Sequence, residues 1–368
     1  MKKNFLFRLS AIAMSLILVA CGGSTSEDVV ENETTAIESE ESLNVVVTTP
    51  MLGEFVKQVA GDSVVLDILM PAEADPHTYD PSPQDAAKIA DADIVLYVGI
   101  KYETSSLLKL IENTASTNAT LLEIGEEIDP IEFIDGERDH GHYDDHDEEG
   151  HDDDKDHDHD DEDGHDDHDD EDGHDDHDEE GHEGHEGHDH GSEDPHFWFD
   201  PVRVAMAVEV IKDSLVSLDP ANSSTYEANA DNFISELTDL DAQVKELIES
   251  VSEDNRKIVT THEALGYLEA RYGIEIFATI IPSLSTADEI SPSQIADVID
   301  VIEDNNIKVL FVESEAPSVY AETVVAEAGI TAVTGLYVET LKDGQTYSDF
   351  LISNVTLIVE SLNSAGEG

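Results

Sequence analysis

The chain has 368 residues and is strongly acidic, with 87 Asp and Glu against 17 Lys and Arg and a formal net charge of −70. A surface of this sign repels phosphate backbones, which excludes nucleic-acid binding as the main function. The hydrophobic fraction of 39% is enough for packed cores, and the length fits about two domains of the usual ~100–200 residues.

The N-terminus has the pattern of an export signal. Three basic residues precede an apolar run over residues 9–20, which is too short for a membrane span but typical of a secretory signal peptide. The run ends in Leu-Val-Ala-Cys21, which resembles a bacterial lipobox, although an ordinary signal with a chance cysteine would read the same way. We therefore expect a signal peptide over residues 1–20, a lipid anchor at Cys21 and a flexible stalk over residues 21–42. This places the protein outside the cytoplasm, at the cell surface or in the periplasm.

Cys21 is the single cysteine of the sequence. Disulfides within the chain are therefore excluded, and any metal site has to use nitrogen and oxygen ligands.

Short β-rich runs alternate with helical patterns from residue 43 onward. Strands are predicted over residues 43–49, 64–70, 94–99 and 120–124, and helices over residues 51–60, 83–92 and 105–115. Such alternation indicates parallel βα units, with functional groups on the loops at the carboxyl ends of the strands. We expect an N-terminal α/β lobe over residues 43–201.

An acidic, histidine-rich tract interrupts this lobe, as an insert over residues 138–193. Residues 139–194 hold 31 Asp and Glu, and 14 of the 17 histidines lie between His140 and His190. Almost no apolar residue is present, so we expect the tract to be disordered without metal. It is either a solvating insert without function or a set of weak, exchangeable metal sites that raises the local zinc concentration or senses zinc.

Apolar residues recur every four and three positions between Tyr226 and Val251. This spacing draws one apolar stripe along a helix of roughly 30 residues. A coiled-coil dimer would give the same pattern, but a single long helix packed across two lobes is favoured, because the stripe lies inside a globular chain. We assign residues 202–255 to connecting helices that include this bridge.

A second alternating block follows. Strands are predicted over residues 257–261, 275–279, 308–312 and 330–337, and helices over residues 263–272, 293–305, 321–328 and 347–362. The block predicts a C-terminal lobe over residues 256–368. The expected fold class is thus α/β, with two (β/α) lobes joined by one long rigid helix.

Three histidines lie outside the tract, and each is expected at a loop corner. His77 and His196 both follow Asp-Pro and are followed closely by a second Asp-Pro, so proline stiffens both loops. His262 follows the strand over 257–261, at a corner that faces the ligand crevice in α/β folds. A lone histidine is more often a core or surface residue than a ligand. Three histidines that all lie at loop corners favour a shared metal site. Imidazole nitrogens are suitable ligands for Zn²⁺, and a carboxylate or water would be the fourth ligand.

The three segments also carry a family resemblance. They read DPHTYDPSP (residues 75–83), DPHFWFDP (residues 194–201) and THEALGYLEARYG (residues 261–273). In this order they resemble the zinc- and manganese-binding lipoproteins that are the substrate-binding components of bacterial ABC transporters, in the zinc-specific branch with a His-rich loop. The resemblance implies two α/β lobes bridged by a rigid helix, a metal in the cleft between them, and no enzymatic activity.

The resemblance also implies a ligand set. His77, His196 and His262 match the family's metal ligands. The fourth family position is a carboxylate, often an Asp two residues after a Leu-Tyr pair, and Glu339 stands there in this sequence. Glu313, Glu315 and water remain rivals for this position. Four aspartates near the histidines could hold the other ring nitrogens or shape turns beside proline: Asp75, Asp80, Asp194 and Asp200.

The expected function follows from this ligand set. Three imidazoles favour zinc, whereas manganese sites in similar proteins tend to have two histidines and two carboxylates. We expect an extracytoplasmic, lipid-anchored, monomeric protein that captures Zn²⁺ and delivers it to an ABC permease and its ATPase. The alternatives are a manganese carrier, a metal-dependent surface adhesin and, with less support, a zinc hydrolase. His262-Glu263 lacks the second histidine of a HExxH motif.

Overall fold

Two four-stranded parallel sheets form the framework of the protein. This computed structural model describes residues 42–133, 193–315 and 319–366. The first sheet has the order β2 (Val64–Ile68), β1 (Leu43–Val47), β3 (Ile94–Tyr97) and β4 (Thr120–Glu123). The second has the order β6 (Glu275–Ile281), β5 (Lys257–His262), β7 (Val309–Glu313) and β8 (Thr331–Leu336). All neighbouring strands are parallel, as predicted, and the two sheets share one strand order.

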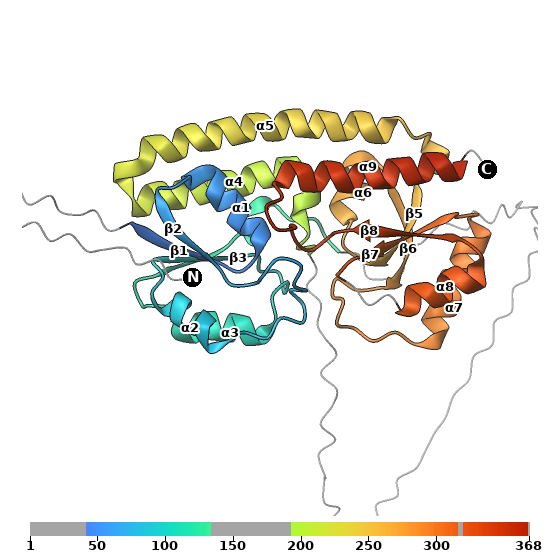
Figure 1. Ribbon diagram of the computed structural model, residues 1–368, viewed down its shortest axis with the longest axis horizontal. Coiled ribbons are helices and arrows are strands. Elements are labelled where there is room, and N and C mark those ends of the chain that lie inside the picture. The colour runs from blue at the N-terminus through green and yellow to red at the C-terminus, as the bar shows by residue number, and fades with distance from the viewer. Residues whose placement is uncertain (1–41, 134–192, 316–318, 367–368) are drawn as a thin grey trace, which may run out of the picture. The chain divides into compact units, whose positions relative to one another are not determined.

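Helices cover both faces of the first sheet (Figure 1). They are α1 (Pro50–Ala60), α2 (Pro83–Ala90) and α3 (Ser105–Thr114). Proline and a side-chain cap fix where α1 and α2 begin, because Thr49 and Ser82 each accept a hydrogen bond from a first-turn backbone amide. The strands are rich in Val, Ile and Leu because the sheet is buried on both sides, with α1 on one side and α2 and α3 on the other.

The second sheet is covered in the same way. Its helices are α6 (Gly266–Tyr272), α7 (Pro292–Asp304), α8 (Val319–Ala328) and α9 (Tyr347–Gly366). Helices α6 and α9 lie on the face toward the long helix, and α7 and α8 lie on the opposite face (Figure 1).

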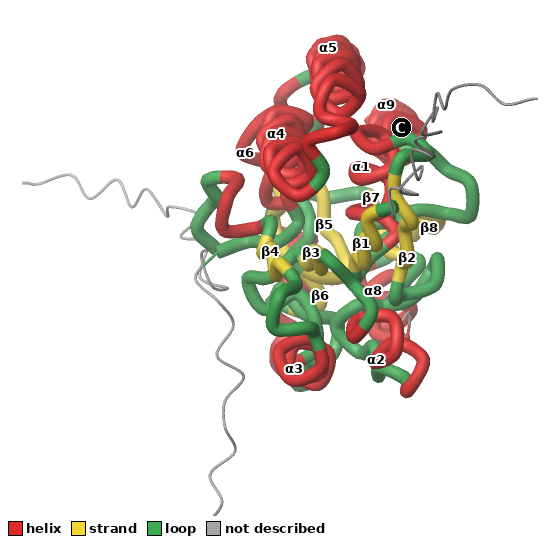
Figure 2. The backbone as a smooth tube through the Cα atoms, turned by 90° about the vertical axis from the view of Figure 1, so that its left-hand side faces the viewer, coloured by secondary structure: helices red, strands yellow, loops and turns green. Residues whose placement is uncertain are grey.

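Two helices join the lobes, α4 (Pro201–Leu218) and α5 (Ser223–Glu249). Helix α5 is the predicted long helix, and it runs across both lobes above the sheets (Figures 1 and 2). A single hydrophobic core extends through both lobes along these helices, from Val45 and Phe55 of the first to Phe311 and Phe350 of the second. The described residues therefore pack as one compact unit.

Some boundaries differ from the predictions. The helix expected from residue 263 begins at Gly266, and His262 is the last residue of β5. Among the described residues, no helix combines the length and apolar character that crossing a membrane requires. The predicted signal peptide, the anchor at Cys21, nearly all of the stalk and the His-rich tract lie outside the described residues.

Candidate metal centre

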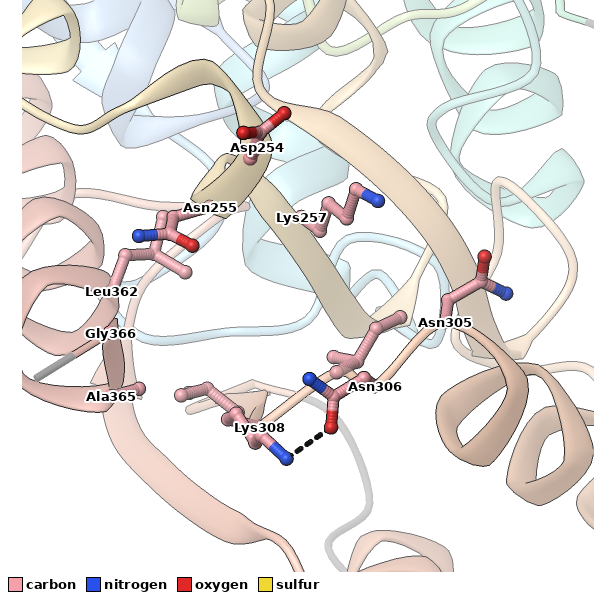
Figure 3. Close-up of a pocket in the computed structure, with 11 residues that line it drawn as sticks. Asp254, Asn255, Lys257, Asn305, Asn306, Lys308, Leu362, Ala365 and Gly366 are labelled. Atoms are coloured by element: carbon pink, nitrogen blue, oxygen red, sulfur yellow. Dashed lines mark hydrogen bonds between the residues drawn. The ribbon is translucent and has the colours of Figure 1, made fainter. Parts of the chain in front are cut away.

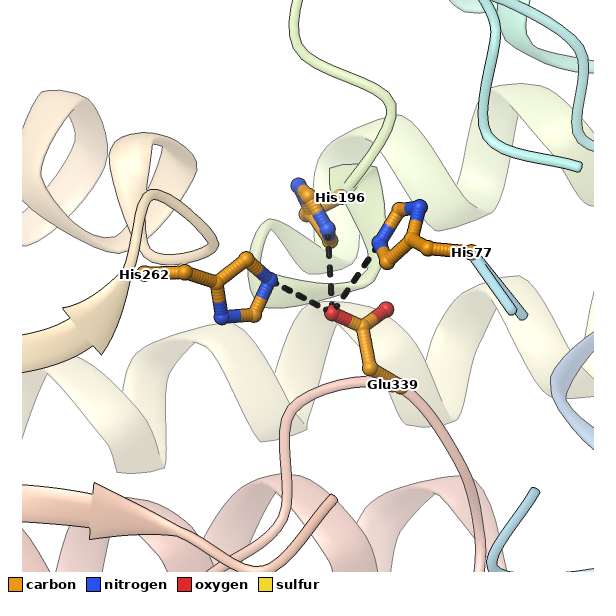
Figure 4. A group of neighbouring side chains, drawn as sticks. All are labelled: His77, His196, His262 and Glu339. Atoms are coloured by element: carbon orange, nitrogen blue, oxygen red, sulfur yellow. Dashed lines mark ion pairs between the residues drawn. The ribbon is translucent and has the colours of Figure 1, made fainter. Parts of the chain in front are cut away.

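Four side chains from distant parts of the sequence converge at the carboxyl ends of the two sheets (Figure 4). His77 lies in the loop after β2, and His196 directly precedes a short 3-10 turn over Phe197–Phe199. His262 ends β5, and Glu339 lies in the loop after β8. One ligand atom from each side chain lies within 4.8 Å of all the others.

The spacing of these atoms suits a metal ion. The Nε2 atoms of His77, His196 and His262 lie 3.5, 3.3 and 2.7 Å from Oε1 of Glu339. Ligands in a zinc tetrahedron, about 2.0–2.1 Å from the ion, lie about 3.3–3.4 Å apart. All three Nε2 atoms and both Glu339 oxygens are buried, and within the described part of the chain none has a hydrogen-bond partner. Buried polar atoms without partners are costly, so this group of atoms fits a bound cation.

Buried carboxylates contact two of the histidine rings at Nδ1, the ring nitrogen that is not directed at the centre. Oδ1 of Asp194 lies 2.8 Å from Nδ1 of His196 and also accepts a hydrogen bond from the His196 backbone amide. Glu313 contacts Nδ1 of His262 and accepts from the backbone amides of Thr261 and His262. A proton held on Nδ1 leaves the Nε2 lone pair directed at the centre.

The charges of the centre shift its pKa values strongly. Burial lowers the pKa of His196, but the Glu339 charge and the hydrogen bond to Asp194 outweigh burial and raise that pKa to about 9. Burial also lowers the pKa of His262, and Glu313 more than reverses this, so that pKa lies well above its usual value. Burial raises the pKa of Glu339, while the neighbouring His196 and His77 rings bring it well below its usual range.

The two glutamates that were rivals of Glu339 have other positions. Glu313 lies behind His262 and not among the converging atoms. The oxygens of Glu315 are buried, but this side chain too is outside the group of four. Burial and the Glu339 charge raise the pKa of Glu315 to about 8.

Aromatic side chains from the first lobe fix the Glu339 loop. Trp198 donates from Nε1 to the carbonyl of Val338 at 2.7 Å, and Tyr102 donates from its hydroxyl to the carbonyl of Glu339 at 3.1 Å. Sequence reasoning missed both residues. Both contacts join parts of the chain more than 100 positions apart, so no local pattern could have revealed them.

Helix α6 of the second lobe docks on the His196 segment. The Tyr267 hydroxyl donates to the Asp194 carbonyl at 2.9 Å and accepts from the Ile131 amide at 3.2 Å. A Cβ atom on Gly266 would lie 2.5 Å from Oδ2 of Asp194, so only glycine permits this close approach. Arg271 adds ion pairs to Asp200 at 3.1 Å and to Asp241 of α5 at 2.5 Å.

Two of the other candidate aspartates, Asp200 and Asp75, form hydrogen bonds with groups other than histidine ring nitrogens. Asp200 caps the N-terminus of α4 by accepting from the Val202 amide, the turn-shaping role considered above. Asp75 accepts from the backbone amide of His77 and from the hydroxyl of Thr286.

A separate polar cavity of about 370 Å³ lies at the amino ends of β5 and β7 (Figure 3). Lys257, Lys308 and Asn306 line it, and Lys308 donates to the Asn306 side chain. None of the four converging residues belongs to this cavity.

A family model matches most of the chain. The model of the family described as zinc-uptake complex component A, periplasmic (ZnuA), matches residues 45–361. The zinc-binding lipoprotein AdcA of Streptococcus pneumoniae is 31% identical over 380 residues, covering 100% of this chain and 62% of AdcA. The manganese-binding lipoprotein MntA of Halalkalibacterium halodurans is 24% identical over 367 residues, covering 98% of this chain and 99% of MntA.

The fold also matches solved structures. The periplasmic zinc binding protein TroA from Treponema pallidum matches with a TM-score of 0.67 at 21% identity, over 86% of this chain and 98% of TroA. This likeness supports the two-lobe architecture. The chain spans 62% of the length of AdcA.

Proposed function

This chain belongs to the family of zinc-uptake complex component A, periplasmic, and on that premise we propose that it is the extracytoplasmic zinc-binding component of an ABC transporter. It captures Zn²⁺ between its two lobes and delivers the ion to a membrane permease that is driven by an ATPase subunit. Zinc is the cargo of this process, and the protein is a carrier rather than an enzyme.

One observation carries the proposal: three imidazole nitrogens and one carboxylate oxygen converge, buried and without hydrogen-bond partners among the described residues. His77, His196, His262 and Glu339 are the proposed ligands. Three nitrogens and one oxygen form a complete tetrahedral set for Zn²⁺.

Zinc is favoured over manganese by the chemistry of these donors. Mn²⁺ prefers harder oxygen ligands and higher coordination numbers, and this site offers one ligating carboxylate. Manganese remains the second candidate cargo, because MntA, which is named for manganese binding, is also similar to this chain.

A zinc hydrolase has less support. Catalytic zinc sites usually have three protein ligands and an open position for water, next to a general base. Here a fourth protein group stands with the three histidines, and the side chains of all four are at most 3% exposed.

We further propose that Cys21 is acylated and tethers the protein to the membrane, and that the His-rich tract gathers zinc near the selective site. The lipobox-like ending of the apolar run and the names of the relatives, which are lipoproteins, support the anchor. The many imidazoles and carboxylates of the tract support the second role.

Metal titration of the full chain tests the proposed site. Trp198 is the single tryptophan of the sequence, and its ring centroid lies 5.5 Å from that of His196, so its fluorescence reports on the site and not on the tract. The wild type should bind one Zn²⁺ tightly and prefer it to Mn²⁺. Alanine variants of His77, His196 or His262 should each lose tight binding, and His165→Ala in the tract is the matched control. A preference for Mn²⁺, or full affinity in the three variants, would contradict the proposal.

A further inference from the structure

The proposed metal centre is closed to solvent. The side chain of His77 is 3% exposed, and those of His196, His262 and Glu339 are fully buried. An ion therefore cannot enter or leave until some segment around the centre moves. The segment that moves most easily should be the one with the fewest buried contacts.

Three of the four residues are held by the core. His196 precedes the fully buried Phe197, Trp198 and Phe199. His262 ends a central strand of the second sheet, and Glu339 lies between the buried Val338 and Thr340. Moving any of these segments would break the hydrophobic packing shared by both lobes.

His77 differs, because an exposed loop over residues 71–81 carries it. Most of this loop is exposed or half-buried, and Pro76 is its one buried residue. After His77, the loop is tied to its own lobe by Tyr79, whose hydroxyl donates to the carbonyl of Leu69 at 3.1 Å and to Asp85 at 3.0 Å.

Before His77, one carboxylate ties the loop to the other lobe. Oδ1 of Asp75 accepts from the His77 backbone amide at 2.9 Å. Oδ2 of Asp75 accepts from the hydroxyl of Thr286 at 2.7 Å. Thr286 is 5% exposed and lies between β6 and α7 of the second lobe. A single side chain thus couples the position of His77 to the opposite lobe.

We propose that Asp75 and Thr286 are positioning residues that form an interlobe latch on His77, and that this latch sets how long the centre retains its ion. The inference rests on the proposed function. When the latch opens, the loop carries His77 away and leaves the ion on His196, His262 and Glu339, with one side open to water and chelators. When it closes, His77 completes the tetrahedron.

Release kinetics test the latch. Zinc-loaded full-length protein is mixed with excess chelator, and the Trp198 signal gives the dissociation rate constant of the centre. Thr286→Val keeps the shape of the side chain and removes the donor, so release should be about fivefold faster or more, since a buried hydrogen bond contributes on that order. Thr286→Ser restores the hydroxyl and should return the rate to within about twofold of wild type.

Two further variants separate the latch from general loosening. Ser285→Ala is the matched control, because the Ser285 hydroxyl accepts only from the nearby Ala287 amide in the hydrogen bonds of this segment, and its release rate should equal that of the wild type. Adding Thr286→Val to Asp75→Ala should cause no additional acceleration, because both changes remove the same bond. The Co²⁺ absorption spectrum of Thr286→Val should stay tetrahedral, which shows that the ligand set is intact.

Unchanged release from Thr286→Val, with normal thermal stability, would overturn the latch while leaving the proposed function standing. Equal acceleration by Ser285→Ala and Thr286→Val would also overturn it. A wild-type protein that binds no zinc would instead overturn the proposed function, and the latch with it.

Discussion

Two glutamates near the centre have pKa values that are shifted in opposite directions. The pKa of Glu339 is held well below its usual range, despite burial, because the His196 and His77 rings lie beside it. Burial and the charge of Glu339 raise the pKa of Glu315 to about 8. At neutral pH Glu339 is therefore ionised and can serve as a ligand, whereas Glu315 is mostly protonated.

This contrast gives a paired prediction. Glu339→Gln removes the charged ligand and should weaken zinc binding by at least about 100-fold, since the neutral amide leaves three imidazoles to hold the dication alone. Glu315→Gln replaces a largely neutral group by a neutral one of the same shape and should change the affinity by less than about threefold. Chelator competition followed by Trp198 fluorescence measures both. Similar losses in the two variants would refute the assignment of Glu339 as the ligand.

The pH dependence follows from His196, whose pKa is raised from 6.5 to about 9 by Glu339 and Asp194 against the effect of burial. The protonated ring stabilises the metal-free fold fully below about pH 6.5, and this stabilisation is lost as the pH rises toward 9. Zinc needs the neutral ring, so its binding releases a proton and strengthens over the same range. Between pH 6.5 and 9 the metal-free melting temperature should therefore fall while the zinc-induced increase grows, as calorimetry can measure. A zinc-induced increase that does not vary with pH would contradict this.

At the level of single residues, loop corners in the sequence marked the three histidines, and the family resemblance added Glu339, with rivals; the structure brings these four side chains together. The sequence offered Glu313 as a rival ligand, whereas the structure places this carboxylate behind His262. That role depends on which strands are neighbours, since β7 pairs with β5. The periodicity of one segment does not contain this information.

Among the elements, the short helix α6 of the second lobe docks directly on the His196 segment through Tyr267. Its first residue, Gly266, leaves no room for a methyl group beside Asp194, whose other oxygen is fixed by His196. Helix α6 and the Asp194 carboxylate therefore have to fit each other closely, and this fit also orients the His196 ring.

Gly266→Ala tests this fit through the sign of its effect. If helix propensity alone mattered, alanine would stabilise the fold by about 1 kcal/mol. We expect a destabilisation of about 1–3 kcal/mol from overpacking, together with weaker zinc binding as Asp194 turns away from His196. Denaturant unfolding and zinc titration measure the two effects, with Ala270→Ser at an exposed position of the same helix as control. A more stable variant with unchanged affinity would refute the argument.

The elements themselves were largely predictable, because hydrophobic periodicity fixes their type. In helix α5, however, the pattern does not predict correctly which residue is buried near the end of the helix. Alternating steps of four and three positions from Tyr226 place Leu247 in the predicted apolar stripe, but the buried residue is Ile248. A helix has 3.6 residues per turn, so a stripe repeating every 3.5 residues drifts around it over several turns. The start of α6 at Gly266 was missed because the Glu263 amide donates to the carbonyl of Ser283, in the loop after β6, and the Ala264 amide donates to the carbonyl of His262.

For the whole molecule, the hydrophobic core shared by the lobes and the placement of the four converging residues together determine how metal binding can move the lobes. His77 and His196 belong to the first lobe, whereas in the second lobe His262 ends β5 and Glu339 follows β8. Neither lobe alone presents the complete set, so a bound ion would link the two lobes directly. Because α4 and α5 already pack both lobes into one core, we expect metal binding to involve loop movements more than a change of the interlobe angle.

Deleting residues 140–190 tests the role of the His-rich tract in the whole protein. Calorimetry of the deletion variant should show that the single tight zinc site remains and that several weak sites are lost, because the four converging residues all lie outside the deleted segment. Loss of the tight site instead would contradict this division of roles.

The base of that tract is closed by an isolated antiparallel bridge between Glu132 and Glu193. The chain thus departs from the lobe and rejoins it at a single point on the surface, and the distance between these two residues does not depend on how many residues separate them. Doubling or halving the length of a flexible loop changes the entropic free energy of closing it by only about 0.6 kcal/mol. This makes the position a suitable insertion site for another protein domain. A fluorescent domain whose own ends lie close together could replace the tract there, turning the carrier into an optical sensor of its cargo.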